Sequence, residues 1–332
     1  MARSRQVVLT SLLVVAAGLL VALWTLYVPA RASVGPLPAS GLAIPASAKF
    51  VGGIDVKRFV ASRLYRRLGA TPDKIEPKVF KELEQTTGLK PERDIERVVV
   101  AGGDRGSFLA MVTGRFERYA LSRAIENRKG VTAKKHEGVT LYLSQEGARG
   151  ATAVAFLDDE TVLMGTQAMV ETTVTNWAQG RAGLKDNATL VAIVERVRPG
   201  STFWVAGDQS LLADMPSSIP LPSQGSSGGS SSVQLPAVKS LSITGDLDPV
   251  FSVEATAEAS DESSAKSLAD VVRGIVALAT LQAQQKPELQ ALASAVNVTT
   301  EAKAVHVSAR IPDELFDTLF AGKPAAPAQA GR

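Results

Sequence analysis

The sequence contains no cysteine and only two histidines, so it lacks the side chains that much covalent and metal chemistry requires. Without cysteine there is no disulfide bond, no thiolate ligand, no cysteine nucleophile and no lipid-modified cysteine. The two histidines, His136 and His306, leave little room for a metal site, because such sites need three or four converging donors. We therefore predict no catalytic residues, no cofactor and no metal.

Aromatic residues are scarce as well, at 5% of the chain, and the net charge is only +3. With no recognisable binding motif, we predict no nucleic-acid partner. The charge is unevenly spread, because Leu241–Phe320 holds 12 acids and 5 bases and the rest of the chain is therefore basic. The predicted helix Asp55–Leu68 carries five cations and one acid. A solvated helix face is the interpretation we favour; docking to anionic head groups or an acidic partner, and packing against the acidic half, stay open.

One long hydrophobic run is present near the N-terminus. Val7–Val28 contains no charge over 22 residues, and a helix of that length is about 33 Å long, enough to cross a hydrocarbon core of about 30 Å. Trp24 and Tyr27 lie near its end, where amphipathic rings favour the membrane interface. Arginines at positions 3 and 5 precede it. We predict a single-pass anchor, with residues 1–6 in the cytoplasm and the bulk of the chain outside it, in the periplasm.

A cleaved signal peptide is the alternative for this run. Ala30-Arg31-Ala32 fits a small-x-small cleavage site, and cleavage after Ala32 would release a secreted protein. Signal peptides usually have an apolar region of about 7–15 residues, which is shorter than Val7–Val28. We favour the retained anchor, and both interpretations place Ser33 onward outside the cytoplasm.

The rest of the chain divides into a tether at 29–44, a first module at 45–198, a second module at 199–320 and a disordered tail at 321–332. Two internal alignments suggest the division. Pro45–Asp55 aligns with Pro199–Gln209, and Val98–Phe116 aligns without gaps with Leu241–Ala259. Two related modules are the interpretation we favour, and chance similarity between two segments of mixed helix and strand is the alternative.

Helices and strands alternate in both modules, and short turns join neighbouring strands. Strands joined in this way are antiparallel, so we predict an α+β fold with largely antiparallel sheets packed against helices. Asp55 is the predicted N-cap of its helix. The predicted helices are Asp55–Leu68, Pro77–Thr87, Tyr119–Asn127, Gln167–Ala178, Asp261–Gln284 and Pro312–Phe320. The predicted strands of the first module are Val98–Ala101, Phe108–Thr113, Thr140–Ser144, Thr152–Phe156 and Thr161–Gly165. Residues 216–236, rich in serine, glycine and proline, form a predicted mobile loop.

A glycine cluster, "GGDRG", ends the strand that begins at Val98, as many phosphate-binding loops do. A phosphate loop leads into a helix, but this one leads into another strand, Phe108–Thr113. We therefore predict a tight turn in which Gly102, Gly103 and Gly106 have positive φ angles.

Two other patterns resemble catalytic motifs. "GSSGG" at Gly225–Gly229 matches G-x-S-x-G with Ser227 at its centre, and Asp246 or Asp248 and then His306 follow in the order of a hydrolase triad. The nucleophile elbow needs a buried strand and a helix on its two sides, and this serine lies in a serine-glycine linker, so a hydrolase is the third-ranked hypothesis. Acidic residues at Asp158–Glu160 and Asp261–Glu262 fit a hairpin turn and a helix N-terminus.

The stretches "IPASAKFVGGIDVKRF" and "GLKPERDIERVVVAG", with the anchor and the proline-rich tether, resemble a loose class of uncharacterised bacterial exported proteins with duplicated modules. The resemblance implies an envelope location and no site residue. We expect a non-catalytic binding or scaffolding protein of the bacterial cell envelope with an envelope protein as its partner. The alternative is a carrier or sensor of a lipid or other apolar ligand, held between the sheet and the helix Asp261–Gln284.

Overall fold

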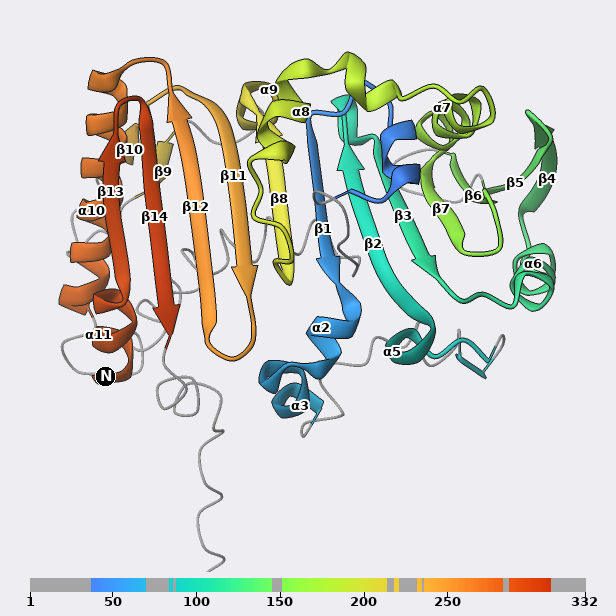
Figure 1. Ribbon diagram of the computed structural model, residues 1–332, viewed down its shortest axis with the longest axis horizontal. Helices are drawn as coiled ribbons and strands as arrows, with labels where there is room; N and C mark the ends of the chain where they lie inside the picture. The colour runs from blue at the N-terminus through green and yellow to red at the C-terminus, as the bar shows by residue number, and fades with distance from the viewer. Residues whose placement is uncertain are drawn as a thin grey trace, which may run out of the picture.

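The computed structural model describes residues 37–69, 84–85, 88–144, 151–213, 218–220, 232–234, 236–282 and 287–311. Within these residues the chain has the expected α+β fold, built on one antiparallel sheet of twelve strands (Figure 1). The strand order is β13-β14-β12-β11-β8-β1-β2-β3-β7-β6-β5-β4. The sheet runs through the predicted boundary between the modules, so the two segments share a single sheet rather than each forming its own.

The strands of the sheet are β1 (Phe50–Asp55), β2 (Ile95–Gly102), β3 (Phe108–Gly114), β4 (Val131–His136), β5 (Val139–Ser144), β6 (Thr152–Phe156), β7 (Thr161–Thr166), β8 (Phe203–Asp208), β11 (Val238–Asp246), β12 (Phe251–Ala259), β13 (Val296–Glu301) and β14 (Ala304–Ile311). The helices are η1 (Ala39–Ala43), α2 (Val56–Ala61), α3 (Arg63–Gly69), α5 (Pro91–Asp94), η3 (Asp104–Gly106), α6 (Arg118–Glu126), α7 (Gln167–Ala178), η4 (Gly183–Asp186), α8 (Ala188–Glu195), α9 (Gln209–Ala213), α10 (Glu262–Gln282) and α11 (Pro287–Ser294).

Several expectations fall on residues outside this description. They are the anchor Val7–Val28, the helix Pro312–Phe320, most of the helix Pro77–Thr87, and Ser227. Among the described residues, no helix combines the length and the apolar character needed to cross a bilayer. The predicted loop 216–236 contains a short antiparallel ribbon of β9 (Ser218–Pro220) and β10 (Ser232–Gln234).

The two central strands of the sheet, β1 and β8, correspond to each other. Each has six residues, begins at a phenylalanine and ends at an aspartate. They pair antiparallel with Gly52 opposite Val205, so a local two-fold axis through this pair relates Phe50 to Phe203. The alignment predicted from sequence is therefore wrong by one residue here, because it matched Phe50 to Trp204.

The correspondence continues outward on both sides of this pair. From β1 the order is β2, β3, β7 and β6, and from β8 it is β11, β12, β14 and β13. The register relates Val99 of β2 to Ser242 of β11, as the gapless alignment predicted, but shifts β12 by two residues against β3. The hairpin of β4 and β5 has no counterpart among the described strands of the second half.

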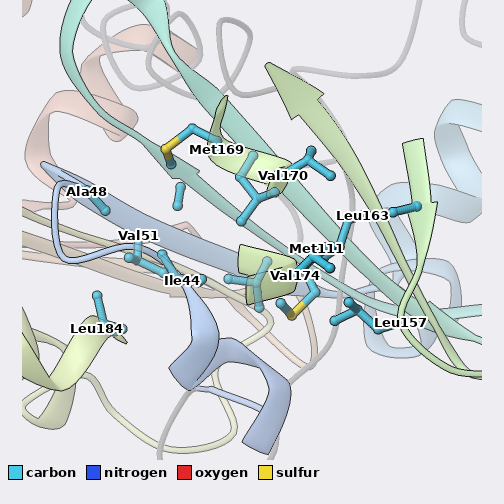
Figure 2. Close-up of a cluster of buried hydrophobic side chains, with 14 of the residues drawn as sticks. Ile44, Ala48, Val51, Met111, Leu157, Leu163, Met169, Val170, Val174 and Leu184 are labelled. Atoms are coloured by element: carbon cyan, nitrogen blue, oxygen red, sulfur yellow. The ribbon is translucent and has the colours of Figure 1, made fainter. Parts of the chain in front are cut away.

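Helices cover the two faces of the sheet unequally. The α7 face of the first half carries the main core, in which side chains of β1, β2, β3, β5, β6 and β7 pack against η1, η4, α7 and α8. Figure 2 shows Met111 and Leu163 of the sheet gathered with Val170 and Val174 of α7. The opposite face, which we call the α10 face, packs against α6 in the first half and against α10 in the second.

The predicted helix Asp55–Leu68 is divided into α2 and α3. Asp55 is the N-cap, as predicted, and its carboxylate accepts from the Arg58 amide at 2.9 Å. The helix breaks at Ser62, whose hydroxyl donates to the Phe59 carbonyl at 2.6 Å and accepts from the Tyr65 amide at 3.1 Å. Serine competes for backbone hydrogen bonds in this way, and the apolar spacing did not reveal it.

The glycine cluster joins β2 to β3, as predicted, through the short helix η3. Only Gly106 has a positive φ, of 73°, so the expectation for Gly102 and Gly103 was wrong. Both glycines instead avoid a collision that a side chain would cause. A Cβ on Gly102 would lie 2.2 Å from the Phe50 ring, and one on Gly103 would lie 2.8 Å from the Ser107 hydroxyl.

Candidate functional site

The α7 face of the second half is polar where the same face of the first half is core. One row across the first half consists of Val99, Met111 and Leu163, which are at most 1% exposed. The register relates these residues to Ser242, Thr256 and His306, which also form one row across β11, β12 and β14. The next row repeats the change, since Leu109 corresponds to Glu254. Polar side chains therefore occupy the positions that hold the core in the first half.

A pocket of about 300 Å³ lies on this polar face. Its lining comes from α8, from the residue that ends α8, and from β11, β12 and β14: Ile193, Arg196, Ser240, Ser242, Thr256, Glu258, Ala304 and His306. Strands fix its floor, because residues on neighbouring strands of one row stand about 5 Å apart. The floor is therefore held in place by the pairing of its strands. The Arg196 side chain at the rim is less constrained, because it is 68% exposed.

Two arginines of the connection between α8 and β8 pair with carboxylates of the polar face. Arg196 Nη1 lies 3.1 Å from Glu258 Oε2, and Arg198 Nη2 lies 2.7 Å from Asp246 Oδ2. Asp246 also accepts from the Thr202 amide at 3.0 Å. These contacts hold the connection against the sheet, and the first of them joins two residues that line the pocket.

His306 stands on the pocket floor, and its Nδ1 lies 3.0 Å from the Thr256 hydroxyl. It is half-buried on the sheet surface. Asp246 and Asp248 do not orient it, because Asp246 pairs with Arg198 and Asp248 lies 3.7 Å from Arg63. Ser242, the serine in the same row on β11, is also too far away to be activated by His306, because two strand spacings, about 10 Å, separate them. The hydrolase order of Ser227, Asp246 or Asp248 and His306 therefore gains no support from the residues described.

His136 belongs to a second polar cluster, at the end of β4. Its Nε2 lies 2.8 Å from the Thr175 hydroxyl on α7, and Lys134 lies 3.1 Å from Glu171 on the same helix. Gln167 and Lys134 donate to the Glu171 carboxylate, and these hydrogen bonds lower the pKa of Glu171. The cluster attaches an outer strand to α7, so we assign it a structural role.

Three cations of α2 and α3 have partners within the molecule. Lys57 pairs with Glu96, Arg58 donates to the Gly200 carbonyl, and Arg63 pairs with Asp248 in the hairpin between β11 and β12. The last two contacts join the basic helices to the second half. These contacts favour packing between the halves over a free basic docking face.

The long helix α10 covers the sheet only in part. Ala265, Leu268 and Ala269 are buried against the α10 face, and Asp261 caps the helix by accepting from the Ser264 amide at 2.8 Å. That hydrogen bond lowers the pKa of Asp261. Leu278 is 37% exposed, and Leu281 is 59% exposed. The pocket described above lies on the other face, away from α10.

The polar face was missed from the sequence, although its residues follow a recognisable pattern. Polar residues alternate with apolar ones along β11 (Ser240, Ser242, Thr244), β12 (Glu254, Thr256, Glu258) and β14 (His306, Ser308, Arg310). Period-two alternation indicates a strand with one face outside the core. The described residues contain no group of three or more histidine, cysteine or acidic side chains placed to hold a metal ion.

Comparison with known proteins gives only distant similarity. No protein-family model matches the chain, and no curated protein matches it. Among solved structures, crystal form I of TP0453 has a TM-score of 0.46 at 10% identity, covering 88% of this chain and 98% of that one. Crystal form IV of TP0453 has a TM-score of 0.44 at 10% identity, covering 85% and 96%.

Proposed function

We propose that this chain is a non-catalytic binding or scaffolding protein of the bacterial cell envelope. Val7–Val28 holds it in the membrane, residues 29–44 act as a tether, and two related α+β modules are displayed in the periplasm. The second module binds through its polar α7 face. A secreted form, cleaved after Ala32, remains the alternative for the N-terminus.

The observation that carries the proposal is the replacement of core residues by polar ones in the second half. Met111 and Leu163 are fully buried, whereas the corresponding Thr256 and His306 line a pocket. A sheet that needed only stability could keep this face apolar and cover it, as the first half does with α7. Half-buried polar groups on a floor of paired strands instead favour recognition of a partner or ligand.

The carrier of an apolar ligand is the second candidate, and the exposed leucines of α10 are the observation in its favour. Leu278 and Leu281 are large apolar side chains open to solvent on one helix. The pocket, however, takes most of its lining residues from polar types, whose hydrogen-bonding groups an apolar ligand would leave unsatisfied. We therefore rank this candidate below recognition of a polar partner.

Photo-crosslinking in native membranes tests the binding function. Thr299 lies on β13 in the same row as His306, and Thr132 lies on β4 at the opposite edge of the sheet. Each is replaced in the full chain by p-benzoylphenylalanine, and the adducts are identified by mass spectrometry. We expect a discrete adduct from position 299 and none from position 132. Identical adducts at both positions, or none at position 299, would contradict a binding role for the polar face.

The anchor makes a separate prediction about the mature N-terminus. If Val7–Val28 is retained, mass spectrometry of the protein purified from membranes should find a chain that begins at Met1 or Ala2. It should also stay in the membrane fraction after a carbonate wash at high pH, because a spanning helix is not released by salt or alkali. A chain that begins at Ser33 and appears in the soluble fraction would establish cleavage instead.

A further inference from the structure

In the pocket on the polar face, the arginine and the glutamate of the lining already pair with each other. Arg196 and Glu258, the cationic and the anionic residue of its lining, lie 3.1 Å apart. A phosphate or other strong anion beside Arg196 would lie close to the Glu258 carboxylate, and a cation beside Glu258 would lie close to Arg196. This ion pair therefore disfavours an ionic ligand in the pocket.

What remains of the polar lining is a set of hydroxyls and one imidazole. Ser242 and Thr256 contribute hydroxyls, the Ser240 hydroxyl donates to Glu258 at 3.5 Å, and His306 contributes an imidazole whose Nδ1 already faces Thr256. A hydroxyl donates one hydrogen bond and accepts two. Such groups match a ligand that is itself rich in hydroxyls, because each ligand hydroxyl can donate a hydrogen bond to the pocket and accept one from it.

The volume of the pocket and its apolar lining residues restrict the class of ligand further. Its volume of about 300 Å³ is at the lower end of the range for small-molecule sites, about 300–1,000 Å³. Ile193 and Ala304 supply apolar surface beside the hydroxyls. A sugar ring presents hydroxyls at its edge and C–H groups on its faces, which fits this combination.

We propose that the polar face binds a neutral, hydroxyl-rich ligand, namely one sugar ring or a short neutral oligosaccharide. The proposal rests on the proposed binding function and specifies its ligand. Ser242 and Thr256 hydrogen-bond the sugar hydroxyls, Arg196 and Glu258 flank it at the rim, and Ile193 contacts its C–H groups.

Saturation-transfer NMR on the full chain tests this assignment. The probes are chitotetraose, cellotetraose and maltotetraose, which are all uncharged, and the protein is kept in a phosphocholine detergent because maltoside detergents would compete. We expect saturable binding of at least one tetrasaccharide. Thr256→Val removes one hydroxyl at nearly constant shape and should weaken that binding about 2- to 10-fold, the range for one neutral hydrogen bond. Combined with Ser242→Ala, the loss should exceed about 10-fold.

The matched control is Thr132→Val, which removes an exposed hydroxyl from β4 at the far edge of the sheet and should leave binding unchanged. An unfolded variant is recognised by loss of the far-ultraviolet circular dichroism of the parent. Binding that Thr256→Val leaves unchanged would overturn the site. If no tetrasaccharide binds while position 299 still crosslinks, the ligand class is wrong and the binding function stands. If both measurements are negative, both proposals fail.

Discussion

Replacing Leu163 by His should destabilise the protein by about 4 kcal/mol or more, whereas replacing His306 by Leu should change its stability by less than about 1 kcal/mol. The two residues hold corresponding positions on β7 and β14. Leu163 is fully buried in the main core, so the variant loses apolar packing and buries an imidazole without a partner. His306 stands on the open polar face, where only its contact with Thr256 is lost.

Urea unfolding of the full chain, followed by circular dichroism and tryptophan fluorescence, measures both changes. A total stability of about 5–15 kcal/mol is usual for a protein, so the Leu163→His variant should unfold at clearly lower urea. The His306→Leu variant serves as the matched control and should lose affinity for the sugar probe without losing stability. Equal destabilisation by the two substitutions would show that the polar face is part of the core.

Replacing Trp204 by Ala should destabilise the protein by about 3–5 kcal/mol, the usual cost of removing a fully buried large aromatic ring. Trp204 lies on β8, is 2% exposed, and belongs to the main core although that core is built mostly from the first half. Its ring lies against Gly53 on β1, where an added Cβ would be 2.9 Å from the indole nitrogen. The substitution therefore removes packing at the contact between the two halves.

Two further variants, Trp204→Phe and Gly53→Ala, test whether the loss of stability comes from the packing of the indole ring. The Trp204 indole nitrogen has no hydrogen-bond partner among the described residues, so Trp204→Phe loses volume but no hydrogen bond and should cost only about 1–2 kcal/mol. Gly53→Ala should be destabilising, because the ring must move to admit the methyl group. Unfolding monitored by circular dichroism and by fluorescence should stay coincident in all three. Two separated transitions would show that the halves unfold independently.

The sequence was informative where one residue or one short pattern determines the local structure. Asp55 was predicted as an N-cap and caps α2, and the strands Val98–Ala101 and Phe108–Thr113 were predicted within three residues of the ends of β2 and β3. Short turns between apolar runs were sufficient to predict the α+β class. These features depend on local chemistry, which a single sequence contains.

The features that the sequence did not reveal depend on pairing between distant strands. The match of Pro45 with Pro199 favoured an alignment that is wrong by one residue in β1, because strand register is set by hydrogen bonds across the sheet. Ser242, Thr256 and His306 are 14 and 50 residues apart and meet only through the pairing of β11, β12 and β14. The break at Ser62 depends on a choice between two local hydrogen-bond patterns that both suit the sequence.

An open sheet has two outer strands, and in this chain the outer strands are β4 and β13. Unpaired edges promote aggregation, and exposed lysines commonly prevent it. Lys134 and Lys135 are exposed on β4. At the other edge, the carbonyl of Lys303, the residue before β14, accepts from the Ala259 amide on β12, so the alternation of the ladder turns the N–H and C=O of Val298 outward. Arg273 of α10 donates a hydrogen bond to the outward-facing carbonyl of Val298 at 3.2 Å. Each end of the sheet thus has its own protection against edge-to-edge polymerisation.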